Sequence, residues 1–123
     1  MGYTFEGDKF LPDNTITKEE LFKLLNIVRS YVDESKYESL DKVTKLDAIK
    51  MITDTLGLEK VAKLSSIYRT SFNDVSYSDD IGYIALAEGL ELVSGDSNNN
   101  FNPNKELSRI EAICIALKLA NIK

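Results

Sequence analysis

Residues 107–111 read Leu-Ser-Arg-Ile-Glu, and this short pattern decides the fold because it occurs three times. Residues 16–20 read Ile-Thr-Lys-Glu-Glu, and residues 43–47 read Val-Thr-Lys-Leu-Asp. Each copy contains an apolar residue, a hydroxyl, a cation, a spacer and an acid, and each leads into an apolar helical pattern. Repetition of this kind predicts a unit that stacks on copies of itself to bury its core.

The hydroxyl and the acid of each copy are typical of a helix N-terminus. The hydroxyl can accept a backbone N–H, and the acid three residues later can return the bond, which completes a capping box. The three predicted pairs are Thr17 with Glu20, Thr44 with Asp47, and Ser108 with Glu111. Helices are therefore expected to begin after residues 17, 44 and 108.

Apolar residues follow these caps at helical spacing, and residues 79–90 add another helix with Ile81, Ile84 and Ala85 facing inward. The second capped helix should stop at Gly57, which can adopt a left-handed conformation, and residues 59–68 suggest a short, weak helix. No segment alternates like a strand. The chain is predicted to be all-α, a small helical bundle of repeats joined by long loops.

The last helix is apolar on nearly every side, with Ile110, Ile113, Cys114, Leu117 and Leu119 among its residues. Such a helix is expected to be covered on most sides. It would lie at the centre of a bundle or at an interface with a neighbouring repeat. Cys114, the only cysteine, is predicted to be a buried apolar residue.

Length and composition restrict the function. The 123 residues suit one domain, and the absence of histidine excludes Ser-His-Asp and Cys-His catalytic pairs and histidine metal ligands. A net charge of −5 argues against nucleic-acid binding. No apolar run is long enough to enter a membrane as a spanning helix. No leader is visible, so a secretion signal would lie outside this segment.

Residues 72–122 resemble one repeat of the S-layer homology family. The resemblance rests on the order and spacing of Phe-Asn-Asp-Val at 72–75, Tyr-Ile-Ala-Leu-Ala at 83–87, Gly-Leu at 89–90, Ser-Gly at 94–95, Phe-Asn-Pro-Asn at 101–104 and Leu-Ser-Arg-Ile-Glu-Ala at 107–112. The tetrad Ser-Arg-Ile-Glu at 108–111 stands where the family carries Thr-Arg-Ala-Glu.

The resemblance implies a non-catalytic module without cofactor that holds an exported bacterial protein on the cell surface. Such domains usually comprise three repeats that bind secondary cell-wall polysaccharide, often pyruvylated, in grooves between repeats. The first two signatures depart from the family because Lys18 and Lys45 replace arginine, and the intervals between hydroxyls are 27 and 64 residues. The chain is therefore interpreted as one domain with degenerate units at about 1–33, 34–58 and 59–123.

The resemblance and the physics of helix ends together predict the ligand site. A cation in the first turn of a helix is unfavourable unless an anion lies there, because the N-terminus already carries partial positive charge. Arg109 would bind a carboxylate with help from the backbone amides of Ser108 and Ile110, and Glu111 would be the capping acid of the same site. Lys18 with Thr17, and Lys45 with Thr44, would act in two sister grooves. Gly95 and Asn102 would shape the neighbouring loop, and Tyr77 would offer a ring to a sugar.

Three alternatives remain open at this stage. Arg109 could instead pair with an acid of a neighbouring repeat. The loop around Asp96, Asn98 and Asn100 has part of a calcium-loop spacing, without the usual glycine and final glutamate. The whole chain could also be an interaction domain with vestigial grooves, whose last helix docks a partner repeat or another chain.

Overall fold

A computed structural model describes residues 14–28, 34–64, 68–75 and 80–122. The described elements, in chain order, are α1 (Lys18–Val28), the 3₁₀ helix η1 (Glu34–Tyr37), α2 (Lys45–Thr55), α3 (Glu59–Ala62), α4 (Ile81–Gly89) and α5 (Arg109–Ala120). Within these ranges no strand is present, and only isolated bridges join Thr15 to Ser108 and Thr44 to Glu106. The prediction of an all-α fold is confirmed.

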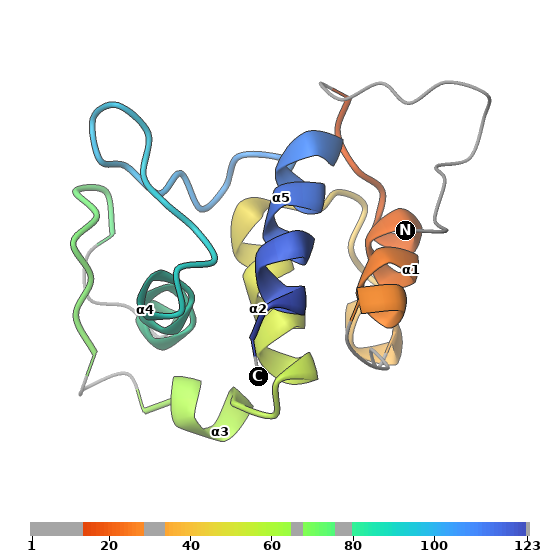
Figure 1. The fold of residues 1–123 in the computed structure, drawn as a ribbon, viewed down its shortest axis with the longest axis horizontal. Coiled ribbons are helices and arrows are strands. Elements are labelled where there is room, and N and C mark those ends of the chain that lie inside the picture. The colour runs from red at the N-terminus through yellow and green to blue at the C-terminus, as the bar shows by residue number, and fades with distance from the viewer. Residues whose placement is uncertain (1–13, 29–33, 65–67, 76–79, 123) are drawn as a thin grey trace.

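The helices form a small bundle in which α1 packs against α5, and α2 packs against α4 (Figure 1). The short helix α3 contacts both α2 and α4. At Gly82 of α4 the approach of α3 is so close that an added Cβ would lie 1.8 Å from the carbonyl oxygen of Ala62. Only glycine permits this contact, which allows α3 to pack closely against α4.

All three predicted capping boxes are present, as the local sequence dictates. The hydroxyl oxygens of Thr17, Thr44 and Ser108 accept the backbone N–H of the acid three residues later at 3.1, 3.1 and 3.2 Å. The acids accept the backbone N–H of the capping residue at 3.0, 3.1 and 3.1 Å. The repeated sequence pattern therefore sets the start of α1, α2 and α5.

Residues 105–109 join the three helix starts to one another. On one side, the Ile16 N–H donates to the Leu107 carbonyl at 2.9 Å, and the Arg109 N–H donates to Asn14 at 2.9 Å. On the other side, the Leu107 N–H donates to Val43 at 2.9 Å, and residue 45 donates to residue 105 at 2.9 Å. The three N-termini consequently meet at one end of the bundle, which is where the sequence places its cations.

The core contains apolar residues that follow the caps at helical spacing, together with the predicted Ile81 and Ile84, and the former include Leu21, Leu24, Leu25, Ala48, Ile49 and Ile52. Ala85 was expected there, but it is half-buried, and Ala87 takes the buried position. Gly57 follows the C-cap of α2 and has φ +73°, as expected for a left-handed helix end. Residues 65–67 and 76–79, and with them Tyr77, lie outside the described residues.

The expectation that α5 is covered on most sides is wrong. Its buried residues are Ala112, Ile115, Ala116 and Leu119, which form one stripe toward the core. On the opposite side Ile110 and Leu117 are 41% and 49% exposed, and Cys114 is exposed as well. The prediction of a buried Cys114 is also wrong, because only one face of this apolar helix is buried among the described residues.

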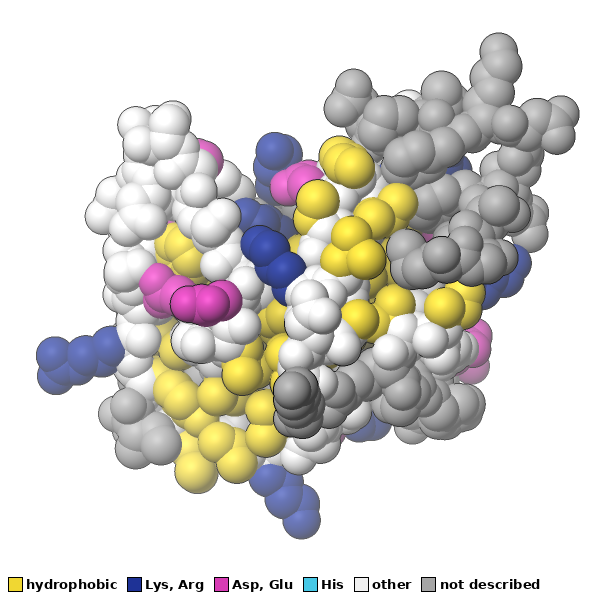
Figure 2. Space-filling view, in the orientation of Figure 1, with side chains coloured by type: hydrophobic (Ala, Val, Ile, Leu, Met, Phe, Trp, Pro, Cys, Tyr) yellow, Lys and Arg dark blue, Asp and Glu magenta, His cyan; other side chains and the backbone are white. Residues whose placement is uncertain are grey.

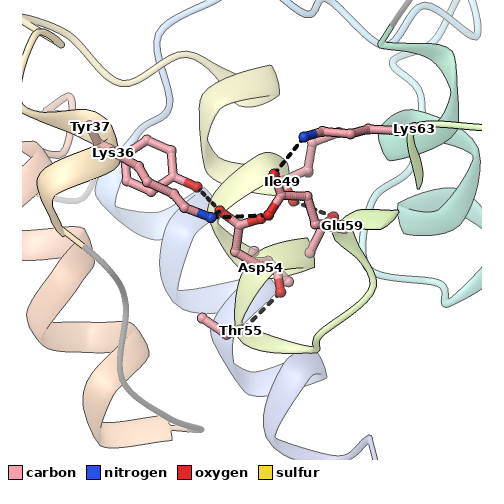
Figure 3. Close-up of polar contacts among 9 residues, drawn as sticks. Lys36, Tyr37, Ile49, Asp54, Thr55, Glu59 and Lys63 are labelled. Atoms are coloured by element: carbon pink, nitrogen blue, oxygen red, sulfur yellow. Dashed lines mark hydrogen bonds and ion pairs between the residues drawn. The ribbon is translucent and has the colours of Figure 1, made fainter. Parts of the chain in front are cut away.

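The far end of α2 is fixed by a group of charged and polar side chains (Figure 3). The Lys36 ammonium lies 3.0 Å from Glu59 and 3.7 Å from Asp54, and Lys63 lies 2.8 Å from Glu59. The Tyr37 hydroxyl donates to Asp54. Hydrogen bonds from Lys63 and Lys36 lower the pKa of Glu59 to about 2. This group fastens η1 and α3 to the end of α2 opposite the three capping boxes.

Candidate functional site

Two carboxylates shape the loop between α4 and α5. Asp74 accepts the backbone N–H groups of Phe101 and Asn102 at 2.7 and 2.8 Å. Asp96 accepts the N–H groups of Asn98 and Asn100 at 2.9 and 3.0 Å. These backbone bonds, with one from the Asn102 side chain, keep the pKa of Asp96 below its usual value. The loop therefore has a defined shape before any ligand arrives.

The same bonds bear on the calcium alternative. Both oxygens of Asp96 accept N–H groups, the second from the Asn102 amide at 3.1 Å. No group of three acidic or thiol side chains that could hold a metal is found among the described residues. Within the part of the chain that is described, the Asp96 carboxylate accepts hydrogen bonds from amides of its own loop and so fixes the shape of that loop.

Lys45, in the first turn of α2, reaches across to this loop. Its ammonium donates to the carbonyls of Phe101 and Ser94 at 2.9 and 3.4 Å, and it lies 4.8 Å from the centroid of the Phe101 ring. Burial lowers the pKa of Lys45, and the nearby Glu111 carboxylate opposes that effect. The charge is thus partly removed from water and lies where an anion would stabilise it.

A groove of about 300 Å³ opens beside Lys45, between α5 and residues 92–96. Four of its residues were candidates from the sequence: Lys45, which was expected in a sister groove, and Gly95, Asn102 and Glu111, which were expected beside Arg109. Two further lysines, an acid, a serine and several apolar residues complete the lining, and these are Lys105, Lys118, Asp96, Ser94, Leu92, Val93, Ile110, Cys114 and Ile115. Figure 2 shows basic and apolar side chains side by side on the face that α5 presents. We call this hollow the Lys45 groove.

Arg109 lies elsewhere, at the junction of α5 with α1. Two nitrogens of its guanidinium donate to the Glu20 carboxylate, at 2.8 Å from Nη2 to Oε2 and 3.4 Å from Nε to Oε1. The two side chains are only 14% and 7% exposed. This is the alternative pairing with an acid of a neighbouring repeat. Arg109 also borders a hollow lined by Thr17, Glu19, Glu20 and Lys23.

The other predicted residues in the described ranges do not line the Lys45 groove. Lys18 donates to the Glu38 carbonyl at 2.8 Å and does not line the Lys45 groove. Thr17, Thr44 and Ser108 all serve as helix caps. Of the three cations that occupy one position in the repeated pattern, Lys18 and Lys45 therefore contact backbone carbonyls and Arg109 contacts a carboxylate.

Sequence reasoning did not identify Lys105 and Lys118 as site residues. Lys118 follows Glu111 by two helical turns, so its presence on the same flank of α5 could have been inferred from the spacing. Lys105 lies in an irregular segment, where no periodicity indicates its direction. Its place in the groove follows from the bonds that join residues 103–107 to the start of α2.

Part of the chain matches a known protein family. Residues 71–113 match the S-layer homology domain. This range includes the Asp74 contacts, the loop at 96–102 and the first turn of α5. No solved structure matches the chain.

Three relatives carry names from the bacterial cell surface. A cell surface protein of Thermoanaerobacter kivui is 31% identical over 100 residues, which are 80% of this chain and 13% of that protein. A surface layer protein of Brevibacillus choshinensis is 29% identical over 62% of this chain and 7% of its own length. A middle cell wall protein of Brevibacillus brevis strain 47 is 26% identical over 76% of this chain and 9% of its own. The chain thus spans a small part of each relative.

Proposed function

The chain carries an S-layer homology domain at residues 71–113, and on this premise we propose that it anchors a larger protein non-covalently to an anionic cell-wall polysaccharide. The family and the three relatives indicate a location at the bacterial cell surface. None of the helices in the described ranges is long and apolar enough to cross a membrane. The attachment that we propose is to the wall polymer, by a non-catalytic module.

The observation that carries this proposal is the gathering of Lys45, Lys105 and Lys118 in one groove. A polysaccharide with acidic substituents, such as pyruvate ketals, offers a carboxylate to these ammonium groups. The carboxylate would offset the desolvation that lowers the pKa of Lys45. The apolar wall of Val93, Ile110 and Ile115 suits the less polar faces of a sugar ring.

The Lys45 groove suits an external anion better than the position of Arg109 does. A carboxylate that binds Arg109 must displace Glu20, which is nearly buried and holds the guanidinium with two oxygens. Lysines offer point charges without a bidentate fork, so the groove should accept acidic sugars with modest selectivity. In this proposal Arg109 and the hollow beside Thr17 contribute less to polysaccharide binding than the Lys45 groove does. Lys18 contributes outside the Lys45 groove.

The test is a calorimetric titration of the folded chain with pyruvylated cell-wall polysaccharide. We expect saturable binding that weakens about tenfold in Lys118→Ala, because one ion pair with a charged ligand is lost. Lys118 is exposed, so this variant should keep the fold. Lys60→Ala, which removes an exposed lysine of α3 outside the groove, is the matched control and should bind like the parent chain.

The polysaccharide stripped of its pyruvate provides the second control. Binding that survives the stripping would contradict recognition of the carboxylate. If the Lys118→Ala and Lys45→Ala variants both bound as tightly as the parent chain, the ligand would lie outside the Lys45 groove. A folded chain that binds neither polymer would favour the second candidate function, an interaction domain, which the exposed apolar side of α5 supports.

A further inference from the structure

The exposed side of α5 has the residue spacing of a coiled-coil seam. Ile110, Cys114, Leu117 and Asn121 follow one another at intervals of four, three and four residues. All four are exposed, and Ile110 and Leu117 are among the most exposed large apolar residues described. Intervals of three and four residues keep side chains in one narrow stripe, which is the pattern by which two helices pair. We call these four residues the α5 stripe.

The charges beside the α5 stripe are complementary to those of a second, identical α5 helix. Glu111 follows Ile110 and Lys118 follows Leu117, so the acid and the base lie seven residues apart on the same flank. The other flank carries the uncharged Ile113 and Ala120. In an antiparallel pair of α5 helices the charged flanks face each other, whereas in a parallel pair each faces an uncharged flank. The charge pattern therefore favours the antiparallel pair.

We propose that the α5 stripe binds a second copy of this chain in an antiparallel, two-fold symmetric pair. The axis passes near Cys114, so Ile110 of each copy contacts Leu117 of the other. Glu111 of each copy lies opposite Lys118 of the other, which gives two equivalent ion pairs, as an isologous interface requires. The two Cys114 side chains meet at the axis.

The dimer should be weak. The 12 residues of α5 span only about 18 Å, and the stripe offers two large apolar side chains per copy. Association is therefore expected at high micromolar concentrations. It is tested without polysaccharide, because the α5 stripe shares Ile110 and Cys114 with the Lys45 groove. Sedimentation equilibrium over a range of concentrations measures the mass.

The decisive variant is Leu117→Glu, which places a charge in the stripe. We expect it to stay monomeric at concentrations where the parent chain is dimeric, a weakening of tenfold or more. Leu117 is half exposed, so the variant should remain folded, as circular dichroism will show. Ile27→Glu is the matched control, since Ile27 is 51% exposed but lies on α1. A dimer that survives Leu117→Glu, or a parent chain that stays monomeric up to millimolar concentration, overturns the proposal.

Cysteine cross-linking tests the direction of the pair. In a Cys114→Ser background, Ile110→Cys and Leu117→Cys chains are mixed and treated with diamide, which takes two protons and two electrons from each pair of thiols. An antiparallel pair should yield the mixed disulfide between positions 110 and 117. Preferential coupling of position 117 to itself would show a parallel pair and overturn the proposed geometry.

Discussion

The junction of α5 with α1 and the Lys45 groove begin from the same sequence pattern and end with opposite properties. At the first, the Arg109 guanidinium and the Glu20 carboxylate lie together in a nearly buried pair. At the second, the Lys45 ammonium binds backbone carbonyls of Phe101 and Ser94 beside an open groove. The capping box is identical in form at all three helix starts, so it fixes where a helix begins. The partner of the neighbouring cation decides whether the surface is closed or open.

The two regions should differ most in the loss of stability that follows removal of their cations. Arg109→Ala leaves the Glu20 carboxylate buried without its partner and should lower the free energy of unfolding by about 3–5 kcal/mol. Lys45→Ala loses bonds to carbonyls near water and should cost about 1 kcal/mol. Urea unfolding followed by circular dichroism gives both values. Similar losses in the two variants would break the comparison.

A double-mutant cycle makes the first value more specific. Arg109→Met with Glu20→Gln should be less destabilised than the sum of the single variants, because no charge is left buried alone. Additive losses would mean that the pair does not act as a unit. Arg69→Met, which removes an exposed cation outside the junction, provides the control.

The loop of the Lys45 groove offers the next test. Asp74→Ala removes the acceptor of the Phe101 and Asn102 N–H groups and should cost about 2 kcal/mol. The same change should loosen residues 96–102 while the start of α1 keeps its protection. Hydrogen exchange of the amides measures both regions in one experiment. Equal loss of protection at α1 would show that the two junctions are not independent.

The caps should respond alike, because they are alike in structure. Thr17→Ala, Thr44→Ala and Ser108→Ala should each cost about 1 kcal/mol. Their serine or threonine counterparts, such as Ser108→Thr, should be close to neutral and serve as controls. A much larger loss for one cap, measured by thermal unfolding, would mean that its hydroxyl has a further role at that junction.

Acid should affect the loop in a small and local way. The N–H groups of Asn100 and Asn98 lower the pKa of Asp96 in the folded state below its ordinary value of 3.8. The stabilisation is therefore present above pH 3.8 and is lost as the pH falls through the lowered pKa. An NMR titration of the Asn98 and Asn100 amides should show a midpoint below 3.8. A midpoint at or above 3.8 would contradict these hydrogen bonds.

The helix starts could be predicted from the sequence because a capping box is complete within four residues. The partner of Arg109 could not, since Glu20 is 89 residues away and several other acids have the same chemistry. The exposure of Cys114 was missed for a related reason. An apolar residue pattern shows that a helix can be buried, but coverage depends on which elements pack against it. The groove likewise needed the position of Lys105, which no periodicity supplies.

The pair between Glu20 and Arg109 also has a consequence for the order of folding. The acid is made early and its partner late, so the ribosome must add 89 residues before the carboxylate can be neutralised. Until then α1 has a capping box but lacks the helix against which it packs. Contacts so distant in sequence slow folding. We expect α2, α3 and α4, which contact one another, to assemble first, and α1 to dock only when α5 completes the domain.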